Sequence, residues 1–213
     1  PLALEQILTN HELEAPRIVE ELRKSKLHIL AEFRDYLAQG FYPFFLQFRD
    51  QKSFLIALEQ SIHAVIESDL PAIHPAMTGN SIARIKRLLS ALAANVPYTP
   101  DLIKLRGLLG IADDRTLKDY LQCLQEGGLV MAISKPGKAL RSMEKPDRIY
   151  LGDPNIAFAL AASGEPDSGS LRETFFCRMV SARHSLASGG RADFLVDGKM
   201  TIEVGGKNKG QEQ

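Results

Sequence analysis

Two acids and a lysine near the end of the chain have the types and spacing that metal-dependent chemistry needs. Asp193 comes directly before the apolar run 194–196, Glu203 lies in the run 200–204, and Lys207 follows it. Two carboxylates held close together repel each other, and a divalent cation is their usual counter-charge. A nearby lysine could orient a water molecule or stabilise a developing negative charge. The pattern predicts either a Mg²⁺ or Mn²⁺ site with Asp193 and Glu203 as metal ligands, or a surface hairpin with acids at its ends.

The two apolar runs that would position these side chains predict a β-hairpin. Residues 194–196 and 200–204 are β-prone, and Asp197-Gly198 between them favours a tight turn. In an antiparallel pair, the residue before the first strand and the residue late in the second strand lie at the same end. The three charged side chains should therefore converge at that end.

This constellation resembles the PD-(D/E)xK core of restriction-endonuclease-like folds. In the intact motif one residue separates the glutamate from the lysine, whereas here Gly205 has that place and Lys207 lies two positions further along. Because side chains of a strand alternate between its faces, Lys207 reaches a metal only if the chain bends at the two glycines. The resemblance implies that Glu173, on the preceding predicted helix, is an additional acid; its alternative role is a capping box with Ser170. The residues expected to catalyse phosphodiester hydrolysis are Glu173, Asp193, Glu203 and Lys207.

Residues 79–152 predict a winged helix. Three helical stretches occur there, the second capped by Asp101 and the third spanning about 114–125. Two helices joined by a tight turn are typical of a helix-turn-helix. The β-prone runs 129–133 and 148–151 then predict a hairpin, which would be the wing.

A DNA-binding winged helix inserts its third helix into the major groove and contacts phosphates with its wing. The candidate nucleic-acid-binding residues are basic side chains of that helix and of the wing: Arg115, Lys118, Lys135, Lys138 and Arg141. Asp113, Asp114 and Asp119 flank the same helix and would repel phosphates. Because winged helices also serve as protein–protein modules, both a DNA contact and a protein contact stay open.

The fold class expected for the whole chain is mostly α with α+β parts. We expect a helical, lid-like segment over 1–78, the winged helix over 79–152, and a partial endonuclease-like α/β unit over 153–213. Helices are expected from near Glu14, over residues 26–39, from Ser53 to about Asp69, from Ser81, over 102–109, over 114–125, from Pro154, and over 171–187 with Ser170 as the cap.

Composition narrows the class of protein further. The chain has 213 residues, 45% of them hydrophobic, and its formal net charge is zero, so any basic surface must be local. Cys123 and Cys177 are far apart and lack metal-ligand spacing, which favours free thiols in a reducing cytoplasm. We find no signal peptide and no apolar run long enough to span a bilayer. We therefore expect a cytoplasmic protein without a membrane partner.

Seven stretches along the chain carry a second resemblance. They are residues 4–11 (LEQILTNH), 40–45 (GFYPFF), 69–71 (DLP), 149–155 (IYLGDPN), 171–176 (LRETFF), 193–199 (DFLVDGK) and 203–210 (EVGGKNKG). In this order they resemble bacterial AAA-type ATPases that carry a C-terminal endonuclease-like domain of unknown function. The resemblance implies that this chain is the C-terminal part of such a protein and that ATP binds only in a preceding nucleotide-binding domain. The chain itself contains no Gly-x-x-x-x-Gly-Lys-[Ser/Thr] phosphate loop.

Three functions are open on these grounds. The chain could be the regulatory and interaction region of an AAA-type ATP-binding protein, with DNA binding through the winged helix and no ATP hydrolysis of its own. It could be a metal-dependent nuclease, or a pure protein-interaction scaffold. The partners expected are DNA or another protein, and an oligomer is open.

Overall fold

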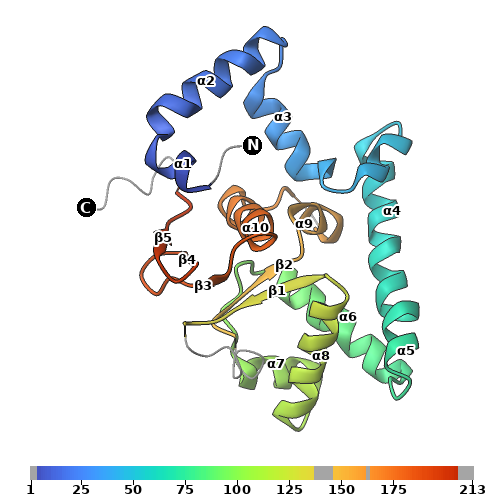
Figure 1. The fold of residues 1–213 in the computed structure, drawn as a ribbon. Coiled ribbons are helices and arrows are strands. Elements are labelled where there is room, and N and C mark those ends of the chain that lie inside the picture. Colours follow the sequence, from blue (N-terminus) through green and yellow to red (C-terminus); the bar gives the residue numbers. More distant parts are fainter. Residues whose placement is uncertain (1–3, 137–145, 162–163, 206–213) are drawn as a thin grey trace.

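The computed structural model describes residues 4–136, 146–161 and 164–205 and is mostly helical, with two small antiparallel sheets. This confirms the expected fold class (Figure 1). The α-helices are α1 (Leu4–Thr9), α2 (His11–Lys24), α3 (Ile29–Asp35), α4 (Gln51–Ala64), α5 (Leu70–Ile73), α6 (Gly79–Ala93), α7 (Leu102–Leu109), α8 (Asp114–Glu126), α9 (Pro154–Leu160) and α10 (Ser168–Ser181). Shorter helical turns are η1 (Tyr36–Gly40, π), η2 (Pro43–Gln47, 3-10) and η3 (Val65–Asp69, π). The strands are β1 (Val130–Ile133), β2 (Arg148–Leu151), β3 (Leu186–Ser188), β4 (Phe194–Val196) and β5 (Met200–Ile202).

Helices α1, α2 and α3 form an arm that stands away from the rest of the molecule (Figure 1). None of their residues is buried. Helix α2 begins at His11, so the expected start near Glu14 was wrong, and Pro16 lies inside the helix rather than in its first turn. The carbonyl of Asn10 accepts the backbone N–H groups of Leu13 and Glu14, which starts the helix upstream of the proline.

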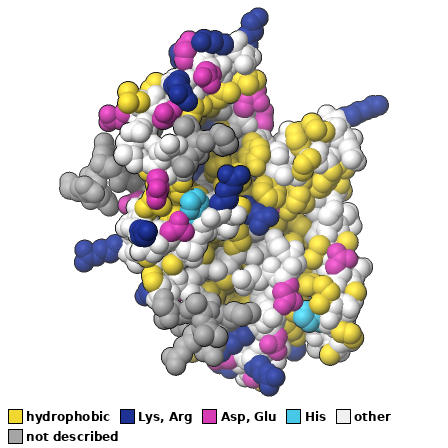
Figure 2. All heavy atoms as spheres, in the orientation of Figure 1, with side chains coloured by type: hydrophobic (Ala, Val, Ile, Leu, Met, Phe, Trp, Pro, Cys, Tyr) yellow, Lys and Arg dark blue, Asp and Glu magenta, His cyan; other side chains and the backbone are white. Residues whose placement is uncertain are grey.

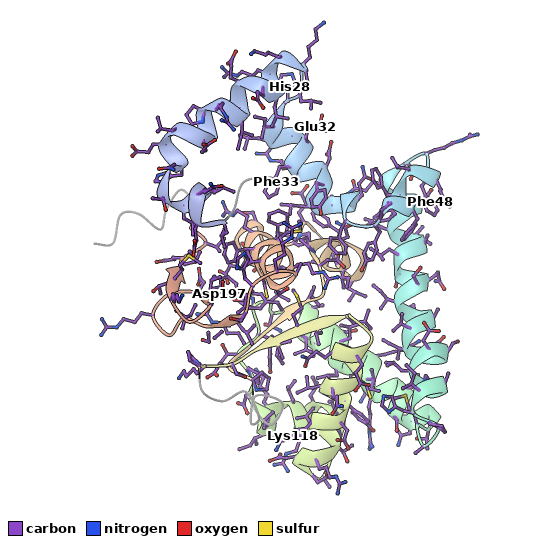
Figure 3. All side chains as sticks on the ribbon, in the orientation of Figure 1. His28, Glu32, Phe33, Phe48, Lys118 and Asp197 are labelled. Atoms are coloured by element: carbon purple, nitrogen blue, oxygen red, sulfur yellow. The ribbon has the colours of Figure 1, made fainter. Side chains whose placement is uncertain are left out.

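Helix α3 attaches the arm to the body. Phe33 packs edge-on against Phe175 of α10, with ring centroids 5.0 Å apart, and Figure 3 shows Phe33 on the side of α3 that faces the body. The single helix expected over 26–39 is interrupted at its start, because Lys26 has a φ of 57° and the helix begins only at Ile29. It then continues into the π turn η1 and ends at Gly40 as expected.

Helix α4 runs along one edge of the molecule and leads through η3 into α5. Its N-cap is Asp50, whose carboxylate accepts the backbone N–H of Ser53 at 2.8 Å, so the expected cap at Ser53 was three residues late. The helical backbone continues past Asp69, because η3 leads directly into α5. Pro71 lies in the first turn of α5, a position that proline tolerates.

Helices α7 and α8 and the β1–β2 hairpin lie where the sequence predicts them. Helix α6 begins at Gly79 with Thr78 as its N-cap, so the expected start at Ser81 was late. Asp101 caps α7, and Gly110 ends it with a left-handed φ of 61°. Strands β1 and β2 pair antiparallel, with Val130 opposite Leu151. Tyr98 forms an isolated antiparallel bridge with Ile149, which adds one residue of a third strand to the hairpin.

One large hydrophobic core extends through α4, α6, α7, α8, the hairpin and α9. Its fully buried members include Phe54, Ile85, Leu117 and Ile156. The expected boundaries at 78 and 152 therefore cross a shared core rather than a gap between separate cores. Among the described residues, no helix is long and apolar enough to cross a bilayer.

The C-terminal unit packs α10 against a three-stranded sheet in the order β3-β4-β5. Strands β4 and β5 form the predicted hairpin, and both Asp197 and Gly198 have the positive φ that its tight turn requires. Helix α10 is capped by Asp167 rather than Ser170 and ends at Ser181, so the expected extent to residue 187 was wrong. Residues 186–188 are instead paired with β4 as strand β3, which we did not predict.

Candidate functional site

Two of the three predicted catalytic acids meet in the structure. Glu173 lies on α10 and Asp193 directly precedes β4, and both residues are buried, with 8% and 7% of their surface exposed. Their side chains converge on the guanidinium of Arg148, which lies on β2. Arg148 Nη1 is 3.2 Å from Asp193 Oδ1 and 3.8 Å from Glu173 Oε2. The β1–β2 hairpin and the C-terminal unit are thus joined by an ion-pair cluster in which both acids are buried.

Tyr150 completes this cluster. Its hydroxyl donates to Glu173 Oε2 at 3.2 Å and accepts from Arg148 Nη1 at 3.4 Å. Burial raises the pKa of Tyr150, so the phenol remains a donor. Burial opposes the charge of Arg148, but its bonds to Tyr150 and Asp193 outweigh this and raise the Arg148 pKa. Neither Arg148 nor Tyr150 was predicted to belong to the site. Because they are two residues apart on a strand, they share one face, and this was the available signal.

Asp193 and Glu203 were predicted to be the ligands of a divalent metal ion. Asp193 Oδ1 faces Arg148, and Asp193 Oδ2 accepts the backbone N–H of Val204 at 2.9 Å. Both oxygens of the expected ligand are therefore engaged by donors, while the second expected ligand, Glu203, is exposed. In the described part of the chain, no group of three or more His, Cys, Asp or Glu could hold a metal ion. These residues as placed do not fit a metal centre, so we derive no step through Mg²⁺ or Mn²⁺. Lys207 lies outside the described residues.

The two basic residues that were predicted to bind nucleic acid from α8 lie on one face of that helix. Arg115 is exposed and Lys118 is half-buried, one turn apart on the same helix, and Figure 3 shows Lys118 at the lower end of the molecule. Gln122 continues this exposed stripe one turn further. The side chains are therefore arranged along one accessible helix face.

The acids that flank this face are largely engaged in contacts with the protein itself. Asp113 is the N-cap of α8 and accepts the backbone N–H of Thr116 at 2.8 Å, which lowers the Asp113 pKa. Asp114 is paired with Arg106 of α7 at 3.0 Å. All three acids weighed against phosphate binding remain exposed.

The β1–β2 hairpin, which was predicted to be the wing, supplies fewer basic side chains than expected among the described residues. Lys135 is exposed, and its ammonium lies 3.8 Å from Asp147 across the base of the hairpin. Lys138 and Arg141, the other two predicted phosphate contacts, lie outside the described residues. The charges of Lys135 and Asp147 at the base of the hairpin therefore offset each other.

A second buried polar cluster ties the segment that follows α3 to the start of α9. Asn155 is fully buried on α9; its side-chain amide donates to the carbonyl of Leu37 at 2.7 Å and accepts the backbone N–H of Phe41 at 3.0 Å. Nearby, the Tyr42 hydroxyl donates to the buried carboxylate of Asp153. Two of the quoted sequence stretches, 40–45 and 149–155, thus meet in space.

The turn of the β4–β5 hairpin is also fastened. Asp197 accepts from the backbone N–H of Ser185 at 2.9 Å and lies 2.7 Å from His184 Nδ1. The His184 contact, followed by the Ser185 contact, lowers the Asp197 pKa. His184 therefore helps to hold the turn.

The fold and these clusters define a mostly helical α+β protein in which a three-helix and hairpin unit is fastened on both sides by buried polar contacts. The chain belongs to the family described as Domain of unknown function (DUF8612), whose profile matches residues 30–167. Asn155 and Arg148 lie within that span, whereas Glu173 and Asp193 lie outside it. No curated protein and no solved structure matches the chain.

Proposed function

We propose that residues 79–152 are a winged helix and that the exposed face of α8 binds the phosphates and groove of double-stranded DNA. The observation that carries this proposal is that the exposed Arg115 and the half-buried Lys118 lie one turn apart on one face of α8. Asp114 is paired with Arg106, which offsets part of the acidic charge beside this face. A basic helix face that keeps its cations accessible attracts the phosphate backbone.

The order of elements supports the same interpretation. Helix α6 is followed by Tyr98, which bridges Ile149, and then by α7, α8 and the β1–β2 hairpin. Arg84 donates to the carbonyl of Gly110 at 2.9 Å and Arg106 to that of Ala112 at 2.9 Å, so the turn between α7 and α8 is braced by side chains. A braced turn fixes the orientation of α8, which groove recognition requires.

We propose further that this region serves as the interaction part of an AAA-type ATP-binding protein and does not hydrolyse ATP itself. The support is the resemblance of the seven stretches and the lack of a phosphate loop in these residues. Two free, buried cysteines favour a reducing cytoplasm as its location.

DNA binding can be tested by fluorescence anisotropy with a labelled mixed-sequence duplex over a range of salt concentrations. Wild type should bind with affinity that falls steeply as salt rises. Arg115→Ala with Lys118→Ala should weaken binding and reduce the salt slope by about 1 for each side chain that contacts a phosphate. Lys52→Ala, which removes an exposed cation on α4, is the matched control. Equal binding by the double variant and the control would overturn the assignment of this face.

The nuclease remains the rival function, because Glu173 and Asp193 do come together. Its test is calorimetric titration with Mg²⁺ or Mn²⁺, using wild type, Asp193→Ala and Glu203→Ala. Binding that both substitutions abolish would support the nuclease, with Lys207→Ala as the next variant. A chain that binds neither metal nor DNA would favour the protein-interaction scaffold.

A further inference from the structure

The arm presents apolar side chains that the described chain does not cover. Leu13 on α2 is 76% exposed and Leu30 on α3 is 73% exposed, although no residue of either helix is buried. Figure 2 shows hydrophobic side chains at the surface among acidic and basic ones over the upper part of the molecule, where Figure 1 places these helices. Large apolar side chains that a fold leaves exposed in one region are typical of an interaction surface.

A cleft of about 860 Å³ lies in the inner angle between α2 and α3. Its apolar lining includes Val19, Leu27 and Leu30, and its charged lining consists of Arg23, Lys26 and Arg34. None of the lining residues is acidic. The cleft therefore suits an apolar side chain that is flanked by carboxylates.

The first turn of α2 has that chemistry. Leu13, the more exposed of the two leucines, stands between the exposed Glu12 and the half-buried Glu14. The Glu14 carboxylate is paired with Arg17 at 3.2 Å, so Glu12 is the accessible acid beside the leucine. The helix dipole alone favours acids at the start of α2 and the bases Arg23 and Lys24 at its end. It does not explain the exposed leucine, nor the cations Lys26 and Arg34, which lie beyond α2. One end of the arm is thus complementary in charge and polarity to the other end.

We propose that a second copy of this chain occupies the cleft, with Leu13 of each copy seated between Leu27 and Leu30 of the other. A two-fold axis near the middle of α2 would place the two α2 helices antiparallel. An isologous contact of this kind forms twice, so each copy supplies one acidic leucine knob and one basic cleft. A helix of 14 residues is about 21 Å long, which separates the two contacts along a single continuous interface.

Sedimentation velocity over a range of protein concentrations tests the proposal. Wild type should form a dimer, and Leu13→Asp and Leu30→Asp should each raise the dimer dissociation constant at least tenfold. Both side chains are exposed, so neither substitution should unfold the chain, which circular dichroism would verify. Ile103→Asp on α7 is the matched control, since Ile103 is also 76% exposed. It should leave the dimer unchanged.

Charge reversal tests the complementarity itself. Glu12→Lys with Glu14→Lys should weaken the dimer, as should Arg23→Glu with Arg34→Glu, because each pair places like charges together. The variant that combines all four substitutions should dimerise again, and rising salt should weaken the wild-type dimer. A wild type that stays monomeric at every concentration overturns the proposal and leaves the cleft to a different acidic protein. A dimer that survives both aspartate substitutions also overturns it.

Discussion

Arg148 on β2 and Asp193 before β4 lie 3.2 Å apart, in a cluster where both side chains are at least three-quarters removed from solvent. The contact joins residues 45 apart in sequence. Because Glu173 faces the same guanidinium, one cation neutralises two acids that would otherwise repel each other. The β1–β2 hairpin and the C-terminal sheet are therefore coupled electrostatically, and Asp193, one of the two acids predicted to bind a metal, has a protein counter-charge.

Removal of this cation should destabilise the fold strongly. Arg148→Ala leaves Asp193 and Glu173 buried without their guanidinium, and loss of one partner of a buried ion pair costs about 3 kcal/mol or more. Urea unfolding gives the free energy of unfolding for each variant. Lys135→Ala, which breaks the exposed pair with Asp147, is the control and should cost less than about 1 kcal/mol.

A variant in which all three charged side chains of the cluster are replaced by neutral ones distinguishes the contribution of charge to stability from that of packing. Arg148→Met combined with Asp193→Asn and Glu173→Gln should recover much of the stability that Arg148→Ala loses, because no unpaired charge remains buried. If Arg148→Ala is no more destabilising than Lys135→Ala, the cluster does not couple the two units.

Local signals predicted the elements well, and their small errors share one cause. Helix α7, helix α8 and the β4–β5 turn were found because caps, Gly110 and the Asp197-Gly198 pair lie next to the elements they define. Two caps were misplaced by three residues, at Asp50 and Asp167. In both places a serine three positions later also suits an N-cap, and its backbone N–H is in fact the donor to the aspartate.

The candidate site could be predicted only in part, because its partners come from distant segments. Glu173 and Asp193 were identified as acids of one site, and they do meet. The alternation of Arg148 and Tyr150 predicts that they share one face of β2, but not which distant segment that face meets. Strand β2 was interpreted as part of a phosphate-binding wing. Asn155 likewise has the local signature of a helix start, although its amide binds backbone groups more than 110 residues away.

Asn155 should be among the least replaceable side chains of the chain. Asn155→Ala would leave the N–H of Phe41 and the carbonyls of Leu37 and Tyr36 without its amide, at a cost of about 3 kcal/mol or more. Asn155→Asp should also destabilise, because a carboxylate cannot donate to the two carbonyls. Urea unfolding measures both, with the exposed Asn95→Ala as a control that should change stability by less than about 0.5 kcal/mol. Similar losses for Asn95→Ala and Asn155→Ala would contradict this role.

Two glycines should respond to alanine with opposite signs. A Cβ at Gly152 would lie 1.9 Å from the carbonyl oxygen of Gly128, so Gly152→Ala forces the backbone apart and should cost about 3 kcal/mol or more. A Cβ at Gly107 meets nothing within 4 Å, and that residue lies inside α7. Gly107→Ala should therefore stabilise by roughly 0.5–1 kcal/mol. Thermal and urea unfolding check both signs. A stabilising Gly152→Ala would show that the residue after β2 and the residues before β1 are not this closely packed.

The two aspartate caps Asp153 and Asp113 should contribute opposite pH dependences. Burial raises the pKa of Asp153, an effect that the Tyr42 hydrogen bond opposes without cancelling, so the folded state binds this proton more tightly than the unfolded chain. Stability from this group therefore falls as the pH rises from the ordinary Asp pKa through the raised one. At Asp113 the backbone N–H of Thr116 lowers the pKa, so stability is present above the ordinary pKa and is lost as the pH falls through the lowered one.

Asparagine substitutions isolate the two effects, because asparagine is also a good N-cap. Relative to wild type, Asp153→Asn should gain stability on going from about pH 3 to about pH 7, which bracket the ordinary Asp pKa of about 3.9. Asp113→Asn should lose stability relative to wild type over the same interval. Urea unfolding at both pH values measures the two differences. Equal pH dependence for the two variants would mean that Asp153 is not held in a desolvated site, and that the contact between α9 and the segment around Tyr42 is open to water.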